Sequence, residues 1–409
     1  MTVHAIRTQP QPPHHAAPEA PPRNHRERAG VEQHLRFHDA KLAEKFARGK
    51  VPITTLYEAY FDGKVDIPGD IYDFLAERDH YVKYEITSEH VKFLFKNFIP
   101  EATIHSKNQD RRIVRAHYDR GDDFFRAFLG DRMVYTSAYF KDGPTKSTLE
   151  EAQDEKMNRC CRKLDLKPGE KLADIGCGWG TLVRHAAMHY GADATGITIS
   201  KNQTEFGNAR IEKAGVADKA RLLCVDYRDT PKRAYDKIVS LEMVEHAGVK
   251  NLPKYFSKVF ELLKDDGRFL LQWTGLRRAG FDGVPPVGLR AEDMIWGLFM
   301  AKYIFPGADA SLPLSDMMRY AEKAGFEIHS VENVSIHYAW TIKAWHDNWL
   351  ANKKQILDSY GERWFRIWHM FLAWAVCIAK QGSAACFQVV FNKNRNDFDR
   401  SQYVGSDKL

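Results

Sequence analysis

The sequence predicts an α/β protein in which helices cover both faces of a parallel sheet. The first observation is an alternation of strand-like and helix-like runs from about residue 147 onward, which is typical of parallel sheets. The second is a glycine-rich turn that follows the first of these strands and opens a helix. The third is a composition with 44% hydrophobic and 28% charged residues, which excludes a fully disordered, collagen-like or fibrous chain.

Local signals place the elements of this α/β region. A capping box at residues 147–151 starts a helix that runs to about residue 164, and Pro168 and Gly169 end it. Strands are predicted at residues 171–175, 194–199, 221–225, 237–241, 268–273 and 387–392. Further helices are predicted at residues 181–189, 252–263, 338–352 and 362–379.

The chain has 409 residues, enough for two or three domains. Residues 1–30 hold six prolines and four histidines and are predicted to be a disordered tail. Residues 31–146 are predicted to form a helical N-terminal cap, either for packing alone or also for contact with lipid. Residues 147–409 are predicted to form the α/β domain, with helical insertions over its pocket.

Composition also bears on partners and compartment. A net charge of +6 suits an anionic membrane surface or an acidic substrate, and no nucleic-acid partner is expected. No charge-free apolar stretch reaches about 18 residues, so no transmembrane helix is predicted. Six cysteines without a CxxC pair predict neither a disulfide framework nor a metal site, and a cytoplasmic protein is expected. The basic run at 107–120 is either a solvated helix face or a phosphate-binding surface for peripheral membrane contact.

The glycine-rich turn carries the strongest functional signal. Asp174 ends the first strand, and Gly176, Gly178 and Gly180 follow at alternate positions. Glycines there let the backbone turn sharply and approach a ligand closely. The spacing fits neither the dinucleotide pattern nor a P-loop. It resembles the S-adenosylmethionine site of class I Rossmann-like methyltransferases.

Two later strand ends fit the same interpretation. Thr198 and Gln203 follow the second strand, where many class I enzymes place an acidic residue for the ribose and this chain has none. Asp226 and Tyr227 follow the third strand, where an aromatic ring beside a carboxylate suits the adenine end of the cofactor. Each pair alone would also fit an ordinary turn.

Further blocks resemble the cyclopropane-fatty-acid synthase family of methyltransferases, over residues of about 115 to 392. They lie at residues 117–125, 133–140, 174–180, 198–203, 226–229, 242–248, 302–306 and 387–391. Details at 241–246, 296–300 and 360–364 are similar to the branch with fungal sphingolipid C9-methyltransferases. Those enzymes carry membrane spans near the N-terminus that have no counterpart here, so a fatty acyl chain is at least as strong an expectation as a sphingoid chain.

The resemblance implies methyl transfer from S-adenosylmethionine to the double bond of a lipid chain. The alkene attacks the methyl group, a carbocation forms, and loss of a proton gives a cyclopropane or a methyl-branched alkene. The resemblance places Tyr135 and Thr136 beside the methionine part of the cofactor, with Tyr118 nearby.

The resemblance also implies a catalytic site around a bicarbonate ion that acts as the base. Glu245 and Tyr338 match the glutamate and tyrosine of that site, whereas Ser137 stands at its cysteine position and Gln272 at its histidine position. Both replacements can still hydrogen-bond an anion, but neither carries charge. Bicarbonate therefore stays open, and the changes favour a methyl branch over ring closure.

Two other functions remain open from the sequence. A small-molecule N-methyltransferase shares this fold and would need a pocket that receives an amine. A non-catalytic lipid-binding relative would bind the cofactor without turnover. A homodimer is also left open.

Overall fold

The computed structural model describes residues 34–93, 121–232, 234–280, 283, 288–306 and 312–403. The predicted tail, the basic run at 107–120 and Tyr118 lie outside these residues. Within them, no helix combines the length and the apolar character that crossing a membrane requires.

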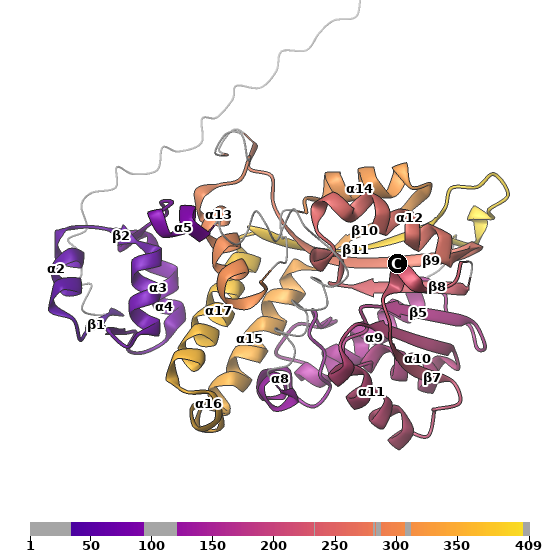
Figure 1. The fold of residues 1–409 in the computed structure, drawn as a ribbon, viewed down its shortest axis with the longest axis horizontal. Coiled ribbons are helices and arrows are strands. Elements are labelled where there is room, and N and C mark those ends of the chain that lie inside the picture. Colours follow the sequence, from indigo (N-terminus) through magenta and orange to yellow (C-terminus); the bar gives the residue numbers. More distant parts are fainter. Residues whose placement is uncertain are drawn as a thin grey trace, which may run out of the picture.

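The α/β domain is built on a seven-stranded sheet with the order β10-β11-β9-β8-β5-β6-β7 (Figure 1). Five strands are parallel, and their bounds lie within a few residues of the prediction except for a longer β9. They are β5 (Lys171–Ile175), β6 (Asp193–Thr198), β7 (Ala220–Cys224), β8 (Tyr235–Leu241) and β9 (Leu263–Leu276).

The other two strands add an antiparallel edge to the predicted parallel sheet. β11 (Ala384–Lys393) pairs antiparallel with β9 and with β10 (Phe326–Asn333). The sequence pattern predicts β11 but gives no strand signal at β10. β10 is an edge strand that is buried only at Phe326, so its sequence lacks the apolar run of the central strands.

Alternate strand residues enter two separate cores, one on each face of the sheet. Ile175 and Leu271 pack with α12 (Leu252–Leu262) and α14 (Leu314–Lys323). Leu172 and Leu270 pack on the opposite face with α9 (Leu149–Leu164), α10 (Thr181–Tyr190) and α11 (Lys201–Lys213). The predicted capping box is present, because the Thr148 side chain accepts from the Glu151 backbone and Glu151 accepts in return.

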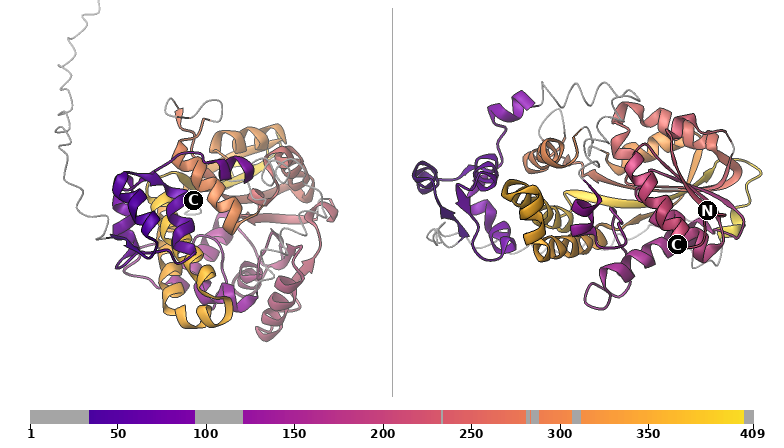
Figure 2. Two further views of the ribbon diagram at one scale, coloured as in Figure 1. Left: turned by 60° about the vertical axis from the view of Figure 1, so that its left-hand side comes forward. Right: turned by 60° about the horizontal axis from the view of Figure 1, so that its bottom comes forward.

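A layer of helices lies between this domain and an N-terminal lobe (Figures 1 and 2). The layer consists of α13 (Ala291–Phe299), α15 (Ser335–Ala351), α16 (Lys353–Tyr360) and α17 (Glu362–Lys380). Trp345, Trp349, Trp368 and Trp374 are almost completely buried in its core. The short helix α8 (Asp122–Leu129) packs on α15, where Asn348 and Asn352 donate to the carbonyls of Phe128 and Ala127.

The N-terminal lobe combines helices with very short strands. The helices are α2 (Ala40–Arg48), α3 (Ile53–Phe61), α4 (Ile71–Glu77) and α5 (Ser88–Phe93). β1 (Arg36–Phe37) pairs with β3 (Val65–Asp66), and β2 (Val51–Pro52) pairs with β4 (Val82–Lys83). The lobe packs on α17 through α3 and α4.

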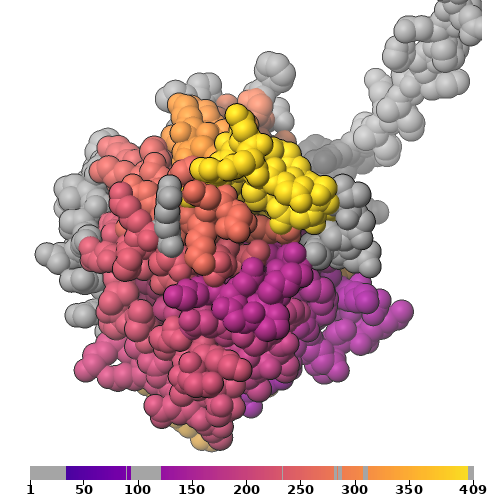
Figure 3. Space-filling model, turned by 90° about the vertical axis from the view of Figure 1, so that its right-hand side faces the viewer, coloured from indigo at the N-terminus to yellow at the C-terminus, as the bar shows by residue number. Residues whose placement is uncertain are grey.

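The last described residues return to the surface of the α/β domain. The turn Arg400–Tyr403 places the Tyr403 ring against His329 of β10, with ring centroids 3.4 Å apart. Arg400 pairs with Glu327 at 2.8 Å. Figure 3 shows this segment (yellow) on one end of the molecule, beside α14 (orange).

Candidate active site

A cavity with both polar and apolar lining residues, called here the cofactor cavity, lies where β5 ends and α10 begins. The glycine turn forms one wall, and Tyr135, Thr136 and Lys156 of α9 form another. Gly176 has φ +81°, and a Cβ there would lie 2.4 Å from Cγ of Met243. Gly178 has φ +53°, and a Cβ there would meet nothing within 4 Å, because this face of the turn opens to the cavity. Gly176 therefore allows the close approach of Met243, and Gly178 leaves room for a ligand.

Asp174 supplies a group in this cavity that needs a partner. It is 3% exposed, and among the described residues its Oδ1 has no hydrogen-bond partner. Burial raises the pKa of Asp174 to about 7, although the positive charge of Lys156 lowers it. An unsatisfied buried carboxyl oxygen is costly, and a ligand ammonium group would remove that cost. The amino group of S-adenosylmethionine fits this position, and the Gly178 face fits close contact with the same molecule.

Of the other predicted cofactor residues, some lie at or next to this cavity and others do not line it. Gln203 lines the cavity, and Thr198 stands behind it, donating to Gln203 Oε1 at 2.8 Å. Gly180 caps the N-terminus of α10 with φ +76°. Asp226 and Tyr227 are not among the described residues that line the cavity. The Asp226 carboxylate binds Arg228 at 2.8 and 2.6 Å, and the Tyr227 ring lies 5.8 Å from that of Tyr255.

A second cavity, called here the apolar chamber, lies between the sheet and the helical layer. Its wall is mostly apolar and comes from β9, β11, α13, α15 and α17, with Leu276, Trp296, Ile342, Phe371, Ala375 and Ile378 among its residues. Polar side chains gather at one end: Glu242, Glu245, His246, Thr274, Ser335 and Tyr338. Tyr135 and Glu242 line both the apolar chamber and the cofactor cavity. A long alkyl chain in the chamber would therefore meet the cofactor beside these two residues.

Glu242 is the centre of the polar end, although the sequence analysis did not select it. It follows the last residue of β8 with φ +55°. Its carboxylate accepts from the Tyr338 hydroxyl at 2.7 Å, from Gln272 Nε2 at 2.5 Å and from the Ser137 backbone N–H at 3.4 Å. Gln272 Nε2 also lies 3.1 Å from Ser137 Oγ. Three of the four predicted catalytic residues thus converge, and they converge on Glu242.

Glu245 stands apart from that group. It lies in the short 3-10 helix Val244–His246, and its Oε1 accepts from the Thr274 backbone N–H at 2.7 Å. Its buried Oε2 has no hydrogen-bond partner among the described residues. Burial and the charge of Glu242 raise the pKa of Glu245 to about 8, so at neutral pH it holds a proton. Burial also raises the pKa of Glu242, but the hydrogen bond from Tyr338 opposes the shift.

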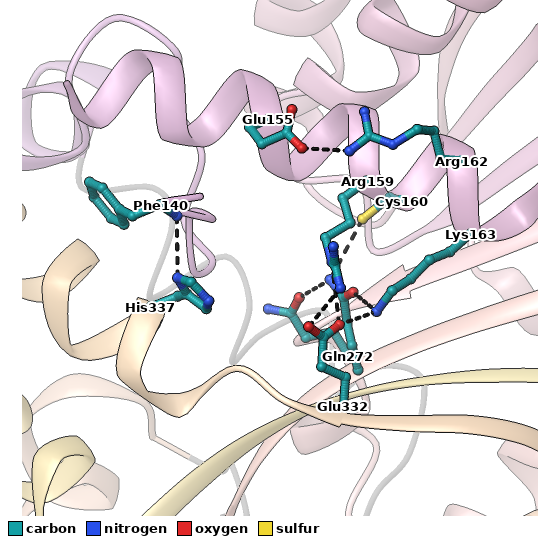
Figure 4. A network of polar contacts seen from close by, with 10 residues as sticks. Phe140, Glu155, Arg159, Cys160, Arg162, Lys163, Gln272, Glu332 and His337 are labelled. Atoms are coloured by element: carbon teal, nitrogen blue, oxygen red, sulfur yellow. Dashed lines mark hydrogen bonds and ion pairs between the residues drawn. The ribbon is translucent and has the colours of Figure 1, made fainter. Parts of the chain in front are cut away.

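A chain of polar contacts fixes the orientation of the Gln272 amide. Lys163, which is buried, donates to Gln388 Oε1 at 2.7 Å and pairs with Glu332. Because an ammonium group only donates, the Gln388 oxygen faces Lys163 and its Nε2 donates to Gln272 Oε1 at 2.9 Å. The Gln272 Nε2 must then face Glu242. Figure 4 shows Lys163 and Arg159 directed toward Glu332, beside Gln272.

One sequence signal could have revealed Glu242. It directly follows a predicted strand at the carboxyl edge of a parallel sheet, where ligands of such folds bind. The resemblance pointed instead to Glu245, three residues further on. Only the left-handed backbone at Glu242 turns its side chain toward Gln272 and Tyr338, and a pattern of residue types does not show that turn.

A sheet of this order, with a glycine turn over a cavity at its carboxyl edge, defines a class I S-adenosylmethionine-dependent methyltransferase. The comparisons with known proteins agree with this class. The family model described as mycolic acid cyclopropane synthetase matches residues 105–389. The chain belongs to this family.

Three similar proteins illustrate the range of the family. The sphingolipid C9-methyltransferase of Komagataella phaffii is 46% identical over 387 residues, covering 92% of this chain and 77% of that protein. The cyclopropane-fatty-acyl-phospholipid synthase of Escherichia coli is 33% identical over 290 residues, covering 71% and 70%. The solved structure of mycolic acid cyclopropane synthase CmaA1 with SAH and CTAB has a TM-score of 0.64 and 29% identity, covering 69% of this chain and 98% of that one.

Proposed function

We propose that the protein methylates a carbon–carbon double bond in the long-chain base of a sphingolipid, giving a methyl-branched chain. The observation that supports this proposal best is the apolar chamber, whose described lining is mostly apolar and which shares Tyr135 and Glu242 with the cofactor cavity. A long alkyl chain fits such a space, whereas a small polar amine does not exploit its apolar wall. The choice of a sphingoid chain over a fatty acyl chain follows the higher identity to a sphingolipid C9-methyltransferase, 46% against 33% for the phospholipid synthase.

S-adenosylmethionine supplies an electrophilic methyl group, and the alkene supplies the electron pair. The residues of the chain then have three tasks. The apolar chamber orients the alkene and excludes water, which positions the reactants. Aromatic rings surround the meeting point: Tyr135 lies 5.7 Å from Phe305 and 5.6 Å from Trp345, measured between ring centroids. Their faces stabilise positive charge on the substrate, and a carboxylate at the polar end is placed to accept a proton.

The test is incubation of the purified protein with methyl-labelled S-adenosylmethionine and two lipids in parallel. One lipid is a ceramide or glucosylceramide with an unsaturated long-chain base, and the other is a phospholipid with an unsaturated acyl chain. We expect mass spectrometry to find one labelled carbon in the sphingoid chain, and proton NMR to find a methyl signal without upfield cyclopropyl protons.

Each other outcome selects a different function. Label in the phospholipid alone would replace the sphingoid substrate by an acyl chain. Upfield cyclopropyl protons would make the product a ring. Cofactor binding without any labelled lipid would contradict the proposal and favour the amine substrate.

A further inference from the structure

We propose that the Glu242 carboxylate is the base that removes the proton from the methylated lipid cation, so that no bound bicarbonate ion is needed. This inference rests on the proposed function and adds a catalytic residue to it. Three features of the structure support it: the position of Glu242, its set of hydrogen-bond donors, and the space that its carboxylate fills.

Position is the first feature. The proton to be removed belongs to the transferred methyl group or to a carbon next to the cation, so the base must stand where methyl donor and alkene meet. Glu242 lines both cavities, together with Tyr135, whereas Glu245 lines the apolar chamber alone. Of the two carboxyl groups at this end, Glu242 is therefore the one beside the reacting carbons.

The donor set is the second feature. Glu242 accepts from Tyr338, from Gln272 and from the Ser137 backbone. Lys163 and Gln388 hold the Gln272 amide with its N–H toward Glu242. Hydrogen bonds to the charged form favour that form, so these three donors stabilise the Glu242 carboxylate and oppose the rise in its pKa that burial causes. Glu245 accepts from the Thr274 backbone N–H, its Oε2 has no partner among the described residues, and its pKa is raised to about 8.

Space is the third feature. Ser137, Gln272 and Tyr338 are the side chains that the sequence analysis assigned to bicarbonate together with Glu245. In the structure all three contact or adjoin the Glu242 carboxylate, whose two oxygens take the hydrogen bonds of Gln272 and Tyr338. A carboxylate presents the same pair of acceptor oxygens as bicarbonate. The chain's own side chain thus occupies the place of an anion among these donors.

The step balances without another reactant. The alkene electron pair forms the new C–C bond to the methyl carbon while the C–S bond breaks, with its pair left on sulfur. A C–H bond next to the cation then breaks, and its pair becomes the C=C bond of the branched product. The proton goes to a Glu242 carboxylate oxygen and later to solvent.

The experiment is a chemical rescue. Glu242→Gly removes the carboxylate and suits the left-handed backbone at this position, which leaves a carboxylate-sized space among the same donors. We expect its rate of lipid methylation to fall about 10²–10⁴-fold, the usual contribution of a general base. Added bicarbonate or formate should raise the methylation rate of this variant at least tenfold. Glu242→Gln is the matched control: its amide fills the space, so we expect the same loss without rescue.

The wild-type protein provides the complementary arm. In buffer freed of carbon dioxide, we expect its rate to stay unchanged. A large fall on removal of bicarbonate, or a Glu242→Gln rate near that of the wild type, would overturn the inference. Either result requires labelled lipid from the wild-type protein, whereas failure of the proposed function would show as no labelled lipid at all. Cofactor affinity and melting temperature of each variant separate loss of the base from loss of the fold.

Discussion

The cofactor cavity and the apolar chamber meet at Glu242 but are assembled differently. The cofactor cavity takes Asp174, Gly176 and Gly178 from one turn, and its other lining residues lie between positions 133 and 242 of the chain. The apolar chamber takes side chains from α13, α15 and α17 as well as from the ends of β9 and β11. Under the proposed function, local backbone geometry would bind the methyl donor, whereas packing between distant helices would bind the lipid chain. Changes on the two sides should have separable effects.

The largest expected effect is on the cofactor side. Gly178→Ala places a methyl group on the open face of the turn, where it would collide with a ligand. We expect the Kd for S-adenosylmethionine to rise at least 100-fold, with stability lowered by about 1–2 kcal/mol from the left-handed backbone. Gly169→Ala is the control, because Gly169 also has a positive φ and open space but does not line the cavity. Thermal unfolding should show the two variants alike in stability, and titration calorimetry should show them unlike in affinity for S-adenosylmethionine. Equal affinity would mean that the open face of Gly178 does not contact the cofactor.

A change in the apolar chamber should lower lipid methylation and leave cofactor binding nearly unchanged. Ala375 of α17 is 5% exposed and lines the chamber, so Ala375→Trp fills space that the lipid needs. We expect methylation of lipid to fall roughly 100-fold while the Kd for the cofactor changes less than threefold, as for about 0.6 kcal/mol or less. Ala375→Ser keeps the volume and should retain most activity. Weakened cofactor binding in the tryptophan variant would show that the two cavities are not independent.

The shared end should respond in a third way. Tyr338→Phe removes a hydrogen bond to the Glu242 carboxylate, and bonds to charged groups are worth about 1.5–3 kcal/mol. We expect kcat to fall roughly 10- to 100-fold, with the Kd for the cofactor unchanged. The measurement is single-turnover methylation alongside equilibrium binding. An unchanged kcat would remove Tyr338 from the chemistry and leave it as part of the chamber wall.

The smallest effect concerns stability and pH. Because the folded pKa of Glu245 is raised to about 8 by burial and by Glu242, the folded protein binds this proton more tightly than the unfolded chain does. The stability linked to the proton is fully present below the unfolded pKa of about 4.3 and is lost as pH rises through about 8. Glu245→Gln cannot lose a proton there. Its melting temperature, relative to that of the wild type, should rise between pH 5 and pH 9; parallel curves would contradict the raised pKa.

The difference between the locally built cofactor cavity and the apolar chamber between distant helices also decides how much could be predicted from the sequence. The glycine turn, Asp174 and the strands from β5 to β9 carry local signals, and the fold class and the family are confirmed. The apolar chamber has no such local signal in the sequence. Ala375 of α17 and Ile342 of α15 lie in helices whose composition is that of ordinary core helices. Strand β10 was missed since its sequence is mostly polar. The roles assigned to individual site residues stay predictions.

The polar end shows a further physical limit. The family resemblance placed Ser137, Gln272 and Tyr338 at a possible anion site, and the structure brings these side chains together. The partner they share is Glu242, and it reaches them through one left-handed residue at the end of β8. A single backbone angle decides which of two nearby glutamates faces the donors. Spacing in the sequence does not encode that angle, because glutamate rarely adopts it.

Helix α17 lies between the apolar chamber and the N-terminal lobe. One side presents Phe371, Ala375 and Ile378 to the apolar chamber. The other side contacts the N-terminal lobe, where His369 Nδ1 lies 2.7 Å from the Tyr60 hydroxyl and Arg366 donates to the Tyr60 and Val65 carbonyls. We therefore expect substitutions in the lobe to shift this helix and reshape the apolar chamber, without touching the glycine turn. Under the proposed function, a change in the lobe would alter the choice of lipid while the cofactor cavity keeps its shape.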